Sequence, residues 1–152
     1  MLPQKSNMAI GLRNLTLALL LVLASAAPVQ AETPERLLLN VTTDSLERGA
    51  MALAFAQAAL RERNAEVVVY LNVDGVRLAN ETAARRTFGD NQSLQQMLRD
   101  FMKYGGRVLV CKLCLEMVAD LNDSSLLKGV EVVEPHVVMT LLFRPNVAVL
   151  TY

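Results

Sequence analysis

The sequence predicts an α/β fold in which an open parallel sheet of five strands carries helices on both faces. Short runs rich in valine and leucine alternate along the chain with longer segments of helical periodicity. Two strands that flank a long helix pair in parallel and are joined by a right-handed crossover. The sequence shows no internal repeat and no low-complexity tract, so we expect one such unit.

The first predicted strand is the apolar run 36–41, and a helix over about 45–63 follows it. Asp44, with Glu47 three residues later, forms a variant of the capping box and is expected to start this helix. The apolar run 66–71 is the next buried strand and completes a strand–helix–strand unit.

The segment 72–92 is long and polar, and we expect a loop there. Loops of this length are often functional, and this one leaves the same edge of the sheet as the two cysteines of the chain. Asp74 and Arg85 in this segment are therefore candidate neighbours of a cysteine site. The alternative for Arg85 and the adjacent Arg86 is a solvated charged face.

The second half of the chain continues the alternation. Ser93 and Gln96 form another capping box, and the helix that they begin is expected to end at Gly105. The remaining expected elements are a strand at 107–110, a helix opening at Cys114 and breaking at 123–125, a strand at 129–133, a helix from Pro135 to Arg144, and a strand at 146–152.

Length and charge limit the class of protein. A chain of 152 residues with a formal net charge of zero suits one domain with one core. The lack of a basic excess argues against a nucleic-acid partner.

The first 31 residues are typical of a signal peptide rather than of a folded segment. Lys5 and Arg13 supply the charged start, Leu15–Ala27 is apolar, and small residues precede a cleavage site after Ala31. Cleavage would leave a single domain over 32–152, with 13 basic and 15 acidic residues, exported to the periplasm. The alternative is an uncleaved membrane anchor, although the apolar run is shorter than the roughly 20 residues that a membrane span needs.

The only two cysteines, Cys111 and Cys114, lie where the third strand gives way to a helix. Backbone N–H groups at such a turn favour a thiolate, and α/β proteins place ligands at this edge of a parallel sheet. Four interpretations remain open: sulfur or redox chemistry, a zinc site, a thioredoxin-type oxidoreductase, or inert packed cysteines. Zinc needs four ligands, and His136 is the one further candidate, while the order of elements does not fit a thioredoxin. An oxidising compartment could also join the two cysteines in a disulfide.

Two further residues are candidate neighbours of the cysteines. Lys112 is a cation beside Cys111, whereas Glu116 lies closer to Cys114, so we expect Cys111 to be the more nucleophilic thiol. His136, the only histidine, is either a base near the same sheet edge or an exposed residue without a role. The sequence has no glycine-rich phosphate loop and no Gly-x-Ser-x-Gly motif, so we expect neither a cofactor nor serine hydrolysis.

Five stretches of the chain together follow a known pattern in order and spacing: Leu71–Val76, Gln95–Leu98, Val110–Cys114, Gly129–Glu131 and Val147–Tyr152. This pattern resembles the DsrE/DsrF-like family and, within it, the YchN-like branch, over the whole of 32–152. The resemblance implies a flavodoxin-like α/β domain, commonly assembled into trimers or hexamers. It also implies a persulfide on the cysteine at the end of the third strand, where Cys111 lies. Cys114 matches the second cysteine of the YchN-like branch.

We therefore expect an exported sulfur carrier in which Cys111 accepts sulfane sulfur, while Cys114 resolves the persulfide or protects Cys111. The expected partners are further copies of the chain and proteins that donate or accept sulfur, with a membrane involved only if the signal segment stays uncleaved. Whether the protein acts as an enzyme of sulfurtransferase type stays open. The alternative is a non-catalytic oligomeric binding or assembly module with a structural or vestigial cysteine pair.

Overall fold

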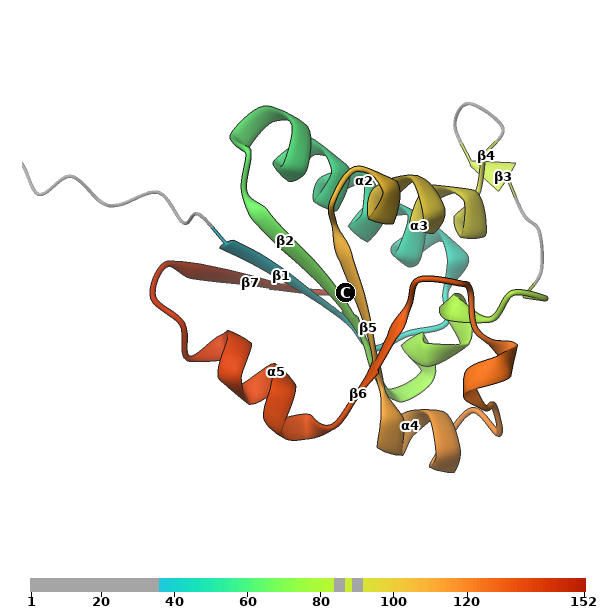
Figure 1. Cartoon of the computed structure of the whole chain (residues 1–152). Coiled ribbons are helices and arrows are strands. Elements are labelled where there is room, and N and C mark those ends of the chain that lie inside the picture. Colours follow the sequence, from blue (N-terminus) through green and yellow to red (C-terminus); the bar gives the residue numbers. More distant parts are fainter. Residues whose placement is uncertain (1–35, 84–86, 89–91) are drawn as a thin grey trace, which may run out of the picture. The chain divides into compact units, whose positions relative to one another are not determined.

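The computed structural model describes residues 36–83, 87–88 and 92–152 (Figure 1). Five parallel strands form the central sheet in the order β6-β5-β2-β1-β7. The strands are β1 (Arg36–Val41), β2 (Glu66–Leu71), β5 (Arg107–Cys111), β6 (Glu131–Val133) and β7 (Val147–Thr151). The helices are α2 (Leu46–Arg63), α3 (Leu94–Lys103), α4 (Lys112–Met117) and α5 (Pro135–Leu142). The predicted α/β fold, with a parallel five-strand sheet flanked by helices, is confirmed.

The direction of the crossovers decides which helix covers which face. The steps from β1 to β2, β5 and β6 all move the same way across the sheet, so right-handed connections place α2, α3 and α4 on one face. The last step returns from β6 to β7, beyond β1, and so places α5 on the opposite face. Figure 1 shows α5 alone on its side of the sheet, across from α2 and α3.

The two faces are consequently buried to different extents. The face under α2 and α3 holds a large core, in which Leu39, Val108 and Phe101 are fully buried. The cluster under α5 is smaller and consists of Leu38, Val68, Leu109, Val133, Val138 and Leu141. Since each fully buried aliphatic side chain contributes about 1.5–3 kcal/mol, α5 is held to the sheet by only a few such contributions.

The start of α2 differs by one residue from the prediction. Ser45 is the N-cap, and its side-chain oxygen accepts a hydrogen bond from the backbone N–H of Arg48 at 3.3 Å. The expected cap, Asp44, was wrong because the sequence offers two adjacent residues that both cap well, and the chain turns into the helix at the second. At α3, the predicted cap Ser93 is confirmed, since its oxygen accepts the N–H of Gln96 at 3.2 Å.

The expectation of a loop after β2 is wrong for the first part of that segment. Residues Val73–Ala79 form a 3-10 helix, η1, in which Val76, Leu78 and Ala79 are buried. A Cβ at Gly75 would lie 2.2 Å from the carbonyl oxygen of Val41, so glycine lets η1 approach the end of β1 closely. The short antiparallel strands β3 (Thr87–Phe88) and β4 (Gln92–Ser93) follow. The segment is polar overall, and its few buried apolar residues were too sparse to indicate a helix from the sequence.

The predicted signal peptide over 1–31 and the candidate neighbour Arg85 lie outside the described residues. Export, cleavage after Ala31 and the start of the domain therefore stay predictions. Within the part of the chain that the structure describes, no helix has the length and apolar character needed to span a membrane.

Candidate cysteine site

Cys111 is at once the last residue of β5 and the N-cap of α4. Its Sγ accepts a hydrogen bond from the backbone N–H of Cys114, with 3.2 Å between sulfur and nitrogen. A Ser or Asp oxygen normally satisfies such a free N–H at a helix start, and here sulfur takes that place. The helix begins at Lys112, so Cys111 lies at its N-cap and Cys114 in its first turn.

Tyr70 contributes a second donor from the neighbouring strand. It lies on β2, which pairs with β5 so that Tyr70 is opposite Leu109, and its side chain hydrogen-bonds that of Cys111. Burial first, and the contact with Cys111 second, raise the pKa of Tyr70 well above its ordinary value, while a hydrogen bond to Asn72 acts the other way. The hydroxyl therefore stays protonated and donates to the Cys111 sulfur.

Cys114 contributes a third donor. Burial first, and a hydrogen bond to Cys111 second, raise the pKa of the half-buried Cys114 thiol, while a backbone hydrogen bond with Val73 lowers it. Cys114 therefore remains a thiol at neutral pH and donates its S–H to Cys111. The Cys111 sulfur thus accepts from the N–H and S–H of Cys114 and from the O–H of Tyr70, an arrangement that stabilises negative charge on sulfur.

Val73 has a strained backbone beside the cysteine pair. Its φ is +49°, in the left-handed region that a β-branched residue adopts only at a cost of about 1–3 kcal/mol. The same residue hydrogen-bonds Cys114 through its backbone, so the strained conformation directs a backbone group at the site. Strain of this kind clusters at functional sites.

Arg77 ties η1 to the far end of α4. Its guanidinium donates through Nη1 to the carbonyl of Ala119, at 3.3 Å, and through Nη2 to the carbonyl of Val118. Asp74, a predicted site neighbour, forms an ion pair with Arg77 at 3.8 Å. The structure therefore places Asp74 in the support of the cysteine helix rather than among the donors to Cys111.

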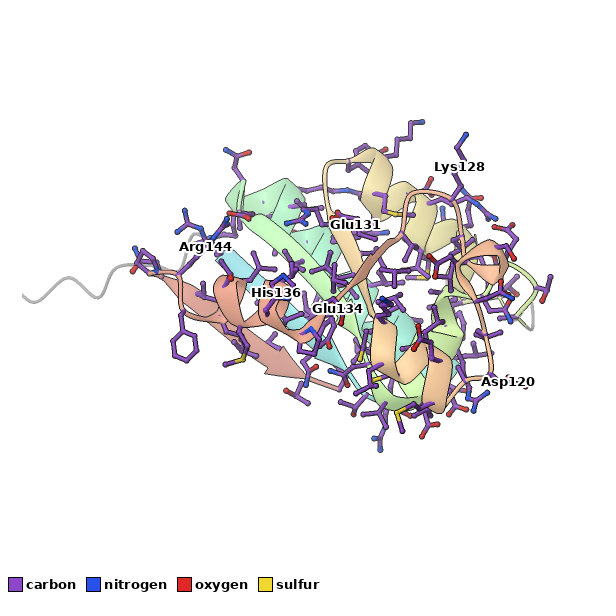
Figure 2. All side chains as sticks on the ribbon, turned by 60° about the horizontal axis from the view of Figure 1, so that its bottom comes forward. Asp120, Lys128, Glu131, Glu134, His136 and Arg144 are labelled. Carbon is purple, nitrogen blue, oxygen red and sulfur yellow. The ribbon has the colours of Figure 1, made fainter. Side chains whose placement is uncertain are left out.

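The other two predicted neighbours lie on the surface near the start of α5. Lys112 is exposed, and its Nζ lies 2.9 Å from Glu134 Oε1; this hydrogen bond raises the pKa of Lys112. The charge that was expected to act on Cys111 is thus matched by Glu134. Figure 2 shows Glu134 and His136 together at the start of α5. His136 is exposed, and the structure does not bring it into the group of donors around Cys111.

A cleft of about 360 Å³ opens beside Tyr70, between α5 and the ends of the strands. Its lining residues are Leu38, Asn40, Tyr70, Asn72, Pro135, Val138, Met139, Leu142 and Val149. The side-chain amide of Asn72 donates to Asn40 Oδ1 at 2.6 Å. The Asn72 Oδ1 atom is buried and has no hydrogen-bond partner among the described residues.

The sequence prediction missed Tyr70, Asn40 and Asn72. Tyr70 could have been noticed from the sequence, because it is the one residue with a polar tip inside the valine-rich strand Glu66–Leu71. Asn40 and Asn72 also lie at the carboxyl ends of β1 and β2, where α/β folds place ligands. The contact between Tyr70 and Cys111 depends on strand register, which the sequence alone did not specify.

The structure also bears on a disulfide and on metal binding at the site. Cys111 and Cys114 are both free in the structure, which therefore represents the reduced form, and their disulfide stays a prediction. In the described ranges, no group of three His, Cys, Asp or Glu side chains is arranged to hold a metal ion.

A model of the DsrE/DsrF-like family matches residues 36–151 of the chain. Among solved structures, the YchN protein from E. coli is similar with a TM-score of 0.62 and 20% identity, covering 77% of this chain and 97% of its own. MTH1491 from Methanobacterium thermoautotrophicum, described as a protein of unknown function, is similar with a TM-score of 0.62 and 16% identity, covering 77% and 98%. These likenesses show the fold. Comparison with curated proteins gives no match.

Proposed function

The chain belongs to the DsrE/DsrF-like family, which is related to sulfur-relay proteins, and we propose on this premise that it carries sulfane sulfur as a persulfide on Cys111. Family membership supports this class of chemistry, and the geometry of the cysteine site supports Cys111 as the carrier residue. Asp74, Lys112 and His136 have supporting or peripheral places in this proposal.

The convergence of three donors on the Cys111 sulfur carries the proposal. A thiolate, rather than a thiol, attacks sulfur, and hydrogen bonds to the charged form favour it. The Cys114 N–H, the Cys114 S–H and the Tyr70 O–H all point at this one sulfur. Cys111 is also only 5% exposed, which limits its reaction with bulky oxidants.

Loading of Cys111 is a thiolate exchange at a persulfide R–S–SH. The Cys111 thiolate forms a bond to the terminal sulfur, the S–S bond of the donor breaks, and R–S⁻ leaves with the electron pair. The proton stays on the transferred sulfur, so the products are Cys111–S–SH and R–S⁻. Delivery to an acceptor thiolate is the same exchange in the opposite sense.

Cys114 can end the persulfide state. As a thiol it first donates its proton to the persulfide group, and its sulfur then attacks the Cys111 sulfur. The Cys111–Cys114 disulfide forms, and the terminal sulfur, which already carries one hydrogen, leaves with that proton and the bonding electron pair as H₂S. Because the pKa of Cys114 is raised, this step is slow at neutral pH, which leaves time for delivery of the sulfur.

Mass spectrometry of protein incubated with a persulfide donor tests the proposal. We expect a gain of one sulfur on wild type and on Cys114→Ser, and no gain on Cys111→Ser. Absence of the gain from every form would exclude the carrier function. A gain that survives in Cys111→Ser would move the function to Cys114.

A separate observation favours the alternative of an assembly module. Large apolar side chains are exposed on several elements, with Phe143 82% exposed and Met117 75% exposed. Such surface is commonly covered by a partner, so we propose a homo-oligomer, and the family resemblance implies a trimer or hexamer. Light scattering at micromolar concentration measures the assembly, and a monomer at all concentrations would contradict it. A carrier can also be an oligomer, so the mass measurement separates the two functions.

We propose export to the periplasm on the strength of the amino-terminal sequence. The sulfur donor and the sulfur acceptor would then be periplasmic as well. Edman sequencing of the protein from the cell envelope should begin at Glu32, and a full-length membrane-bound product would contradict the proposal.

A further inference from the structure

We propose that the cleft beside α5 binds the small-molecule sulfur donor, an aliphatic persulfide R–S–SH with an uncharged R group, next to Cys111. This inference rests on the proposed function, because it names the class of compound from which Cys111 takes its sulfur.

The cleft has the size and place of a ligand site. Its volume of about 360 Å³ lies within the range of roughly 300–1,000 Å³ that ligand pockets occupy. It lies near the carboxyl ends of the strands, and its lining includes Asn40 from β1 and Val149 from β7. From β1 the chain adds β2, β5 and β6 on one side, whereas β7 joins β1 on the other side. Open α/β sheets bind ligands at such a switch point.

The lining of the cleft favours a donor whose R group is apolar and uncharged. Six of the nine lining residues are apolar: Leu38, Pro135, Val138, Met139, Leu142 and Val149. The other three, Asn40, Tyr70 and Asn72, are polar and neutral. A donor such as glutathione persulfide would bring carboxylates and an ammonium group into a cleft whose lining has no charged partner, at a high desolvation cost. A short aliphatic R group has no such cost.

The polar end of the cleft adjoins the reactive sulfur. Tyr70 lines the cleft and also hydrogen-bonds the side chain of Cys111. Its strand β2 is the neighbour of β5, and paired strands lie roughly 4.8 Å apart. Asn72, at the same end, keeps a buried oxygen without a hydrogen-bond partner among the described residues, which a bound donor group would complete.

These features orient the donor. With R in the apolar part of the cleft, the –S–SH group lies at Tyr70 and Asn72 and faces Cys111. The Cys111 sulfur bonds to the terminal sulfur, the S–S bond of the donor breaks, and R–S⁻ keeps the electron pair and stays in the cleft until it dissociates.

Filling the cleft from its exposed side tests the inference. Val149 lines the cleft and is 47% exposed, and strands tolerate aromatic residues, so Val149→Phe narrows the cleft without disturbing the core. The rate of persulfide formation on Cys111 is measured by peptide mass with two donors, n-butyl hydropersulfide and inorganic disulfide, HS–S⁻. We expect Val149→Phe to slow the butyl donor by about tenfold and to leave the inorganic donor unchanged.

Leu150→Phe is the matched control. Leu150 is the next residue of β7, similarly exposed at 41%, but its side chain points to the opposite face of the sheet. It should change neither rate. Met139→Trp, at the exposed cleft residue Met139, should repeat the selective loss and guards against a folding defect in the first variant.

The outcomes separate the two proposals. Equal slowing of both donors by Val149→Phe, or no slowing of the butyl donor, would overturn the cleft while leaving Cys111 as carrier. A wild-type preference for glutathione persulfide over the butyl donor would also overturn it. Failure of every donor to load Cys111 would remove the proposed function and this inference with it.

Discussion

The hydroxyl of Tyr70 and the sulfur of Cys111 are hydrogen-bonded across two neighbouring strands, β2 and β5. Because the pairing of these strands fixes both residues, the donor is held in place by the sheet rather than by a loop. The reactivity of Cys111 is therefore tied to the pairing of strands in the central sheet.

Replacing Tyr70 by Phe should make Cys111 less reactive. The change keeps the ring and removes the O–H donor, and hydrogen bonds to a charged group contribute about 1.5–3 kcal/mol. We expect alkylation of Cys111 by iodoacetamide at neutral pH to slow by about tenfold or more. Tyr104→Phe is the control, since Tyr104 is exposed at the end of α3, under the guanidinium of Arg61. An unchanged alkylation rate in Tyr70→Phe would show that the hydroxyl does not stabilise the thiolate.

Cys114 should label later than Cys111 as the pH rises. Its raised pKa keeps it a thiol beyond the ordinary thiol value of about 8.5, so its labelling should begin only at alkaline pH. In Cys111→Ala, one cause of that raised pKa is lost, and labelling of Cys114 should begin at lower pH. Peptide mass after timed alkylation gives both profiles. Faster labelling of Cys114 in wild type would reverse the roles assigned to the two thiols.

The ion pair between Arg107 and Glu131 should make the free energy of unfolding depend on pH in the acidic range. Arg107 joins Glu131 through two hydrogen bonds, of 2.9 and 2.7 Å, which lower the pKa of the Glu131 carboxyl. A lowered folded pKa adds stability above the unfolded value of about 4.3, and this stability is lost as the pH falls through the folded pKa. Since both side chains are partly exposed, Glu131→Gln should cost no more than about 1 kcal/mol at pH 7, and less at pH 3, below the unfolded value.

Urea unfolding at the two pH values measures this difference. A double-mutant cycle with Arg107→Gln isolates the pair from other effects of each change. A cost of Glu131→Gln that stays equal at both pH values would mean that the charge of Glu131 does not stabilise the fold.

Gly75→Ala should destabilise the fold more than a typical surface change. The added Cβ would meet the backbone oxygen of Val41 at 2.2 Å, and backbone cannot yield as a flexible side chain does. We expect a loss of about 2 kcal/mol or more in urea unfolding. Gly105→Ala is the control: Gly105 has open space around it but a φ of +96°, so strain of about 1 kcal/mol is expected. Equal losses would show that η1 moves freely away from β1.

Alternation of apolar runs and helical periods was enough to predict the sheet. Short runs rich in β-branched residues, such as Glu66–Leu71, favour buried strands, and long helices between them favour parallel pairing. The position of Cys111 at a strand end followed from the Gly105–Gly106 stop and the short run after it. Each of these features depends on residues that are near one another in the chain, so the sequence pattern was sufficient to predict it.

Tyr70, which hydrogen-bonds Cys111, and the cleft beside it could not be predicted in this way, because they combine residues that are distant in the sequence. Tyr70 is 41 positions earlier, and only the register of β2 against β5 brings its hydroxyl to the sulfur. The cleft combines residues of β1, β2, α5 and β7, so it has no signature in any one segment. The sequence also did not indicate that the charge of Lys112 is paired, because its partner Glu134 follows a different strand and is distant in the chain.

Attachment of α4 to η1 at both ends has a consequence for motion. Val73 hydrogen-bonds Cys114 near the start of α4, and Arg77 holds the carbonyls of Val118 and Ala119 just past its end. Neither element can detach without breaking both attachments, so they should open and close as one cooperative unit. The amides of η1 and α4 would then share a single protection factor in hydrogen exchange, and each opening would expose both cysteines at the same moment.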